Sequence, residues 1–152
     1  MTDSRIFMMG QFEAQFPADR RYAKNHMWAR PQTGGYRCGF SAYAGRLLQD
    51  VYFLDWNIDP GTQLREKQPI GSIESSKAES ELYSPMAGTL TQFNPALLSD
   101  PSTINVDTYG DGWLFDMDAT GDNLLSPDDY LVHLAAAWAV AERTIKGQMN
   151  EE

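Results

Sequence analysis

The chain has 152 residues, a length typical of one domain with a single hydrophobic core. Hydrophobic residues make up 42% of it, which is too apolar for a disordered chain. Twelve basic residues against 21 acidic ones give a net charge of −9, so the chain repels phosphate backbones and anionic membrane surfaces. We therefore expect neither nucleic acid nor a membrane as a partner.

A single cysteine, Cys38, excludes an intrachain disulfide and any zinc or iron–sulfur site built on several thiolates. No apolar run approaches the ~20 residues of a membrane span, and residues 1–10 lack the basic head and long apolar stretch of a signal peptide. We expect a cytoplasmic protein in which Cys38 is a small buried side chain on a strand.

Residues 1–21 are predicted to form an N-terminal extension that lies as a strap on the domain, with Phe12 and Phe16 as its apolar contacts. Residues 22–125 show short apolar runs separated by turn residues, a pattern typical of a small β sandwich or barrel. Ser41 is a candidate N-cap for a short helix. The predicted strands, in chain order, are residues 36–40, 51–56, 70–73, 82–86, 89–93 and 113–117.

The last segment changes to a helical period. Ser126 is the predicted N-cap and Pro127 the first helical residue, while Gly147 closes a helix over residues 126–147. Apolar residues recur along it at helical spacing, with Trp138 as a packing anchor. The pattern predicts a helix that docks on the β domain through one apolar stripe.

Conventional catalysis finds little support in the sequence. There are two histidines, His26 and His133, and no nucleophile-elbow sequence. Residues 116–122 imitate a calcium loop, but Pro127 stands where such a loop needs a bidentate glutamate, so a turn is the better interpretation. We expect no catalytic residue and no metal site.

An exposed hairpin tip is predicted between residues 71 and 85. Apolar residues lie on both sides of a polar centre, which carries one lysine, Lys77, among acidic residues. Taken alone, an exposed lysine at a turn is a solvated charge. The residues around Lys77 change that interpretation.

Lys77 lies in the motif Glu74-Ser75-Ser76-Lys77-Ala78, with Gly71 before it and Gly88 after it. Further blocks stand in a fixed order, His26-x-Trp28 upstream and Tyr109-Gly110-x-Gly112-Trp113 downstream. Together these blocks resemble the glycine cleavage H-protein family over about residues 22–118. Biotin carriers are similar in fold, but they place methionines on both sides of the lysine, where this chain has Ser76 and Ala78.

The resemblance implies a mainly β fold, a lipoyl/biotinyl-type flattened barrel-sandwich hybrid with a short inner helix and a C-terminal helix. It implies lipoate in amide linkage to Lys77 and a role in carrying an aminomethyl group, as a carrier protein that is not itself an enzyme. The expected partners are a pyridoxal-phosphate glycine decarboxylase, a tetrahydrofolate-dependent aminomethyltransferase, dihydrolipoamide dehydrogenase and lipoate-attaching enzymes. The lipoylation motif would comprise Gly71, Glu74, Ser75, Ser76, Ala78 and Gly88.

The resemblance also implies a groove that shelters the loaded arm, formed by Asn25, His26, Met27 and Glu81. Three of these residues depart from the family pattern: Met27 replaces a glutamate, Asn25 a frequent serine, and Glu81 the usual aspartate. These changes leave the lysine motif intact and alter the groove.

Two other interpretations remain open at this point. An H-like lipoyl carrier recruited to another pathway, such as lipoate delivery or sulfur oxidation, is favoured by Met27. A binding module that retained the fold without being lipoylated is disfavoured by the intact motif around Lys77.

Overall fold

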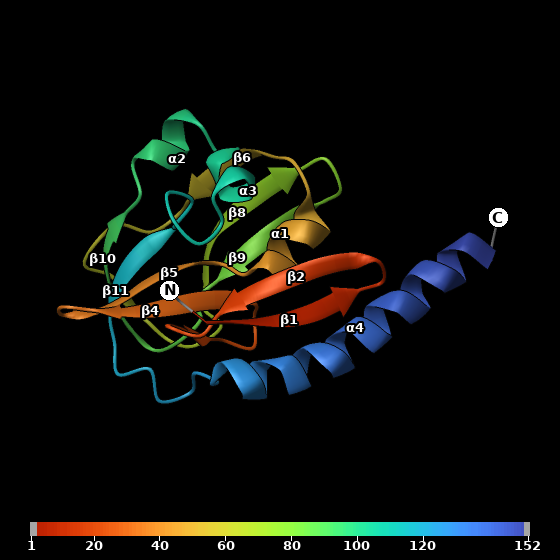
Figure 1. The fold of residues 1–152 in the computed structure, drawn as a ribbon. Helices are drawn as coiled ribbons and strands as arrows, with labels where there is room; N and C mark the ends of the chain where they lie inside the picture. Colours follow the sequence, from red (N-terminus) through yellow and green to blue (C-terminus); the bar gives the residue numbers. More distant parts are fainter. Residues whose placement is uncertain (1–2, 151–152) are drawn as a thin grey trace.

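Three antiparallel sheets and four helices make up the described part of the chain (Figure 1). The structure is a computed structural model that describes residues 3–150, with the side chains of residues 3–143. The hairpin β1-β2 stands apart from a six-stranded sheet, of order β3-β4-β5-β11-β10-β7, and a three-stranded sheet, of order β6-β8-β9. The strands are β1 (Ser4–Met9), β2 (Phe12–Pro17), β3 (Arg21–Tyr22), β4 (Met27–Gln32), β5 (Gly35–Phe40), β6 (Val51–Trp56), β7 (Gln63–Leu64), β8 (Pro69–Ser75), β9 (Glu79–Tyr83), β10 (Gly88–Phe93) and β11 (Phe115–Asp118). The helices are α1 (Ala42–Leu48), α2 (Ala96–Ser99), α3 (Thr103–Val106) and α4 (Pro127–Asn150).

The main core is shared by the six-stranded and three-stranded sheets. Cys38, Leu90 and Phe115 enter it from the larger sheet, and Ile70 and Ile73 enter it from the smaller one; all are at most 1% exposed. Alternation along each strand places these apolar side chains on the inner faces. The predicted mainly β fold is confirmed, and the two sheets remain open at their edges instead of closing into a barrel.

A second core joins the hairpin β1-β2 to helices α1 and α4. In Figure 1 the hairpin lies between α4 and α1, and β1 contacts α4 while β2 contacts α1. Tyr22 and Tyr130 stack with ring centroids 4.6 Å apart, and Phe16 meets Tyr130 edge-on at 5.5 Å. Trp138 packs on the same cluster, as expected of an anchor of the C-terminal helix.

The chain enters and leaves the six-stranded sheet at one place. Tyr22 and Leu125 form an isolated antiparallel bridge, in which the Tyr22 N–H donates to the Leu125 carbonyl at 3.0 Å and the Leu125 N–H donates to the Tyr22 carbonyl at 2.7 Å. The hairpin β1-β2 precedes this bridge, and α4 follows it. The bridge therefore closes the segment that contains both larger sheets.

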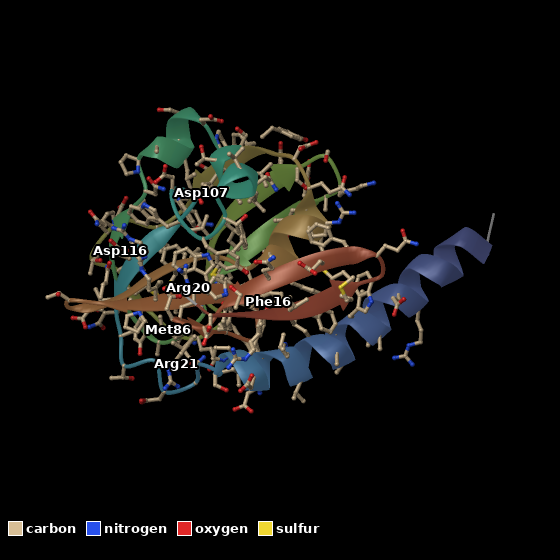
Figure 2. All side chains as sticks on the ribbon, viewed as in Figure 1. Phe16, Arg20, Arg21, Met86, Asp107 and Asp116 are labelled. Carbon is tan, nitrogen blue, oxygen red and sulfur yellow. The ribbon has the colours of Figure 1, made fainter. Side chains whose placement is uncertain are left out.

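A partly buried ion pair joins two neighbouring strands of the six-stranded sheet, β5 and β11. Asp116 of β11, labelled in Figure 2, is 3% exposed and accepts hydrogen bonds from Arg37 Nε at 2.9 Å and Arg37 Nη2 at 3.2 Å. Burial raises the pKa of Asp116, but the hydrogen bonds from Arg37 and Gln92 outweigh burial and lower it. Because Asp116 is committed to this pair, it is not available as a ligand in the calcium-like loop. In the described part of the chain, no three His, Cys, Asp or Glu residues cluster as metal ligands.

Three strand regions differ from the sequence-based predictions. Residues 4–17 form a regular hairpin, β1-β2, where the sequence predicts only a strap. Strand β4 is absent from the predicted set because Arg30 and Pro31 interrupt its apolar pattern, yet it pairs with β5 along its whole length. The strand predicted over residues 82–86 lies earlier, as β9, and Met86 is buried beyond its end.

The helix termini also differ from expectation. Ser41 occupies the N-cap position of α1, but its hydroxyl makes no cap hydrogen bond, and Tyr109 Oη instead accepts the N–H of Ala42 at 2.8 Å. At the start of α4 the predicted cap is present, because Ser126 Oγ accepts the N–H of Asp129 at 3.1 Å. The helix does not end at Gly147 but continues to Asn150.

Candidate functional site

Lys77 lies at the apex of the turn between β8 and β9, as the sequence predicts for an exposed tip. The Ser75 N–H donates to the Ala78 carbonyl at 2.9 Å and closes the turn. The Ser75 hydroxyl braces it from inside, since Oγ accepts the N–H groups of Lys77 at 3.3 Å and Ala78 at 3.2 Å. Ser75 is 5% exposed, so this brace is shielded from water while the lysine projects outward.

Ser76 ties the same turn to a second segment of the chain. Its N–H donates to the Asp50 carbonyl at 2.9 Å, and its Oγ accepts the Asp50 N–H at 3.3 Å. Asp50 connects α1 to β6, so the turn is fixed to the helix end as well as to its own strands. Both serines of the motif therefore hold the backbone of Lys77, which presents the side chain from a fixed base.

Three carboxylates lie on the two strands that flank the turn of Lys77. Glu74 and Glu79 face each other across β8 and β9, and Glu81 follows two residues further along β9. Lys77 makes no ion pair with them among the described residues, so its amine is available to a reagent. Amide formation at this amine would remove a positive charge and leave the tip more acidic.

Two glycines of the motif serve the sheets and not the turn. A Cβ on Gly71 would collide with the backbone carbonyl of Asp55 on β6. A Cβ on Gly88 would lie 2.5 Å from the carbonyl oxygen of Asp118 on β11. The motif thus combines residues that hold the lysine with residues that allow close strand pairing.

A groove of about 250 Å³ lies between α1 and the β8-β9 hairpin, and it includes the four residues predicted to form a groove. Asn25 and His26 line it from the turn before β4, Met27 lines it from the first position of β4, and Glu81 lines it from β9. Most of the other lining side chains are apolar: Phe40, Ala44, Leu47, Leu48, Ile73 and Leu82. Glu81 is the one carboxylate among the described lining residues.

His26 is held in an unusual backbone conformation at the edge of this groove, with φ of +72°. Its Nδ1 lies 2.9 Å from Tyr130 Oη, and its ring packs on Tyr43 with centroids 4.5 Å apart. Burial and the neighbouring His133 lower the pKa of His26 to about 4. The imidazole is therefore neutral at pH 7.

Asn25 and Met27 are committed to the scaffold of the groove. Asn25 Nδ2 donates to the Tyr83 carbonyl at 3.0 Å, and Asn25 Oδ1 accepts the Met27 N–H at 3.3 Å. Met27 is 2% exposed and belongs to the main core. Glu81 accepts a hydrogen bond from Tyr83 Oη at 2.8 Å.

Several residues that shape the site are not predicted from the sequence. Tyr130 reaches His26 from α4, and Asp50 anchors the turn through backbone atoms, which carry no side-chain signal. Ser41 is predicted as a helix cap, but its hydroxyl bonds Tyr130 instead. His133, the second histidine, is structural, because its Nε2 donates to the Lys24 carbonyl at 3.1 Å.

A mainly β domain of two open sheets, with a lysine at the apex of a braced hairpin, has the architecture of lipoyl-type carrier domains. The glycine cleavage H-protein model matches residues 20–142, and the chain belongs to this family. Figure 1 shows that the matched segment includes both larger sheets and most of α4, while the hairpin β1-β2 precedes it.

Relatives agree with this family. A probable glycine cleavage system H protein of Natronomonas pharaonis is 38% identical over 122 residues, 78% of this chain and 96% of the relative. The glycine cleavage system H protein of Rubrobacter xylanophilus is 37% identical over 118 residues, 77% of this chain and 93% of the relative. The crystal structure of a glycine cleavage system H protein from Mycobacterium marinum aligns with a TM-score of 0.70 at 31% identity, covering 79% of this chain and 99% of that one. None of the helices in the described residues has the length and apolarity needed to cross a membrane.

Proposed function

We propose that this chain is a lipoylated carrier of the glycine cleavage system, with lipoate attached to Lys77. In this proposal it delivers an aminomethyl group from a pyridoxal-phosphate glycine decarboxylase to a tetrahydrofolate-dependent aminomethyltransferase. Lipoate-attaching enzymes and dihydrolipoamide dehydrogenase are the further partners. The chain itself supplies attachment, positioning and shelter, and catalyses none of the steps.

The observation that carries the proposal is the placement of Lys77. Its backbone is fixed on both sides by Ser75 and Ser76, while its amine is exposed and has no ion pair among the described residues. An attaching enzyme can therefore reach the amine at a defined position. The groove between α1 and the β8-β9 hairpin offers an apolar surface on the same hairpin that carries Lys77.

The chain needs an attached group for carrier chemistry. Its one thiol, Cys38, is fully buried, and burial raises the pKa of that thiol, so it cannot take up a substrate carbon. Lipoate supplies, when bound, a dithiolane whose sulfurs accept and release such a group. Lys77 would hold it, and His26, Met27 and Glu81 would line the surface that it meets.

The proposal is tested by the mass of the protein isolated from its own host, followed by peptide mapping. We expect a lipoyl increment on Lys77, its loss in Lys77→Arg, and its retention in Lys67→Arg, which changes another exposed lysine at a turn. An unmodified Lys77 in cells that lipoylate their other carriers would contradict the proposal.

The pathway is tested by glycine–bicarbonate exchange with a glycine decarboxylase. The lipoylated protein is expected to support exchange, and the unlipoylated protein is not. A lipoylated protein that fails in this assay, while Met27→Glu restores exchange, would favour a carrier recruited to another pathway.

A further inference from the structure

Three side chains from distant parts of the chain form a hydrogen-bonded series that ends at the groove. Ser41 Oγ lies 2.8 Å from Tyr130 Oη, and Tyr130 Oη lies 2.9 Å from His26 Nδ1. Ser41 and Tyr130 are both 0% exposed. Because α4 supplies Tyr130, the C-terminal helix contacts a groove residue directly.

The number of available protons sets the direction of these hydrogen bonds. Burial raises the pKa of the Tyr130 phenol, so its oxygen carries one proton and can donate once. If Tyr130 donates to His26 Nδ1, Ser41 donates to Tyr130 and every donor in the series has an acceptor. The opposite direction leaves the Ser41 hydroxyl proton without an acceptor, since Tyr130 is the only hydrogen-bond partner of Ser41 Oγ among the described residues. An unpaired buried donor is costly, so the first direction is favoured.

This direction determines where His26 carries its proton. An imidazole that accepts at Nδ1 and is neutral has its proton on Nε2. Nε2 has no hydrogen-bond partner in the described residues, and it is not sealed in the core, because Trp56 Nε1 is the one buried side-chain nitrogen or oxygen there without a partner. His26 lines the groove, so its free N–H is open to solvent there.

We propose that Tyr130 is a positioning residue that fixes His26 as its neutral Nε2–H tautomer, so that the groove offers a hydrogen-bond donor to an acceptor on the arm attached to Lys77. The inference rests on the proposed function for the identity of the arm. An amide carbonyl or an unprotonated amine nitrogen can accept from this N–H, whereas an ammonium group has only donors and cannot. Met27 offers no carboxylate to an ammonium, so Glu81 is the one described lining residue with a carboxylate that could bind one.

Nitrogen NMR of the histidine side chains in the unlipoylated protein tests the positioning step. At pH 7 we expect His26 as the Nε2–H tautomer in the unaltered protein and a mixture of both tautomers in Tyr130→Phe. Tyr22→Phe is the matched control, because it removes the other hydroxyl of the same ring stack, one that donates to the Pro17 carbonyl at 2.7 Å and does not touch His26. We expect the control to retain the tautomer of the unaltered protein.

Two results would overturn the positioning step: an Nδ1–H tautomer in the unaltered protein, or a Tyr130→Phe spectrum identical to it. The first needs no variant and therefore holds even if Tyr130→Phe fails to fold. Ser41→Ala adds an independent check, because it keeps the Tyr130 hydroxyl and is expected to keep the Nε2–H tautomer. A change of tautomer in Ser41→Ala alone would also contradict the proposed direction.

The donor at the groove is tested on lipoylated, aminomethyl-loaded protein. We expect Tyr130→Phe to lose the aminomethyl group about two-fold faster than the unaltered protein, because a mixture of tautomers presents the Nε2–H donor only about half of the time. Its lipoylation at Lys77 should be unchanged, because Tyr130 makes none of the contacts that brace the turn. Equal rates of aminomethyl loss in the two proteins would overturn the proposal that His26 donates a hydrogen bond to the arm. An unmodified Lys77 would instead overturn the proposed function and leave the tautomer result intact.

Discussion

Asp116 and Arg37 stand directly opposite each other on β11 and β5, so their ion pair spans a single rung of the six-stranded sheet. The Arg37 guanidinium also lies 3.8 Å from the centroid of the Trp113 ring, which leaves the arginine side chain 26% exposed. The pair is therefore held between sheet and aromatic ring, where its loss would leave a carboxylate with little access to water.

Removing the cation should be strongly destabilising. Arg37→Met leaves the buried Asp116 with the hydrogen bond from Gln92 but without its bidentate partner, and we expect a loss of about 2–3 kcal/mol in the free energy of unfolding measured with urea. Arg5→Met is the matched control, since the Arg5–Asp128 pair is solvent-exposed and should matter little. A small effect of Arg37→Met would show that Asp116 is protonated or hydrated in the folded protein.

Acid should destabilise the protein through His26. The pKa of His26 is about 4 in the folded chain and 6.5 in the unfolded chain. Between these two pH values the unfolded chain therefore binds more protons than the folded chain. The resulting loss in the free energy of unfolding is therefore absent above about pH 6.5. It grows as pH falls towards 4, to at most about 3 kcal/mol. Urea unfolding across this pH range measures it. His26→Asn, which tolerates the positive φ, should flatten the curve, and an unchanged slope would contradict the assignment.

The hydroxyl of Ser75 should matter for attachment more than for folding. Ser75→Ala removes the acceptor for two N–H groups of the turn, with an expected loss of about 1 kcal/mol in stability. Because the lysine would leave its fixed position, we expect the kcat/KM of a lipoate-attaching enzyme to fall roughly tenfold. Ser72→Ala on the same strand is the control, as its hydroxyl makes no hydrogen bond within the described residues. Equal kcat/KM values of the lipoate-attaching enzyme for both variants would show that attachment does not depend on the Ser75 hydroxyl.

Gly71 is required by sheet packing. Gly71→Ala would push β8 away from the Asp55 carbonyl of β6, and we expect a loss of about 1–3 kcal/mol in the free energy of unfolding. Gly45→Ala in α1 is the matched control: its nearest contact would be Thr108 at an ordinary 3.9 Å, and alanine favours the helix. If the two variants have the same free energy of unfolding, the close approach of β8 to β6 is not the reason for glycine at position 71.

The sequence predicts best where local pattern decides the structure. Strand β6 has the predicted bounds, because a β-rich run there is followed by a strong turn at Asp59-Pro60-Gly61. The exposed tip at Lys77 is likewise a local feature of polar residues between two apolar runs. The pairing of β8 and β9 then follows from the short turn.

Long-range partners account for what the sequence does not predict. Tyr130 meets His26 across 104 positions, and nothing near either residue indicates the other. Ser41 carries a true capping signal, but a phenol from α4 competes successfully for its hydroxyl. The hairpin β1-β2 is similar: its partner surface is built by α1 and α4, so its strands gain their stability from elements far along the chain.

The bridge between Tyr22 and Leu125 has a mechanical consequence. Tension applied between the hairpin β1-β2 and α4 first loads the Arg5–Asp128 pair and this bridge, whose Tyr22 belongs to the edge strand β3 of the six-stranded sheet. The β8-β9 tip lies inside the closed segment and outside that load path. A partner that pulls on the N-terminal hairpin or the C-terminal helix therefore loads strand β3 at the edge of the six-stranded sheet, and strands β8 and β9 do not lie in series with that load.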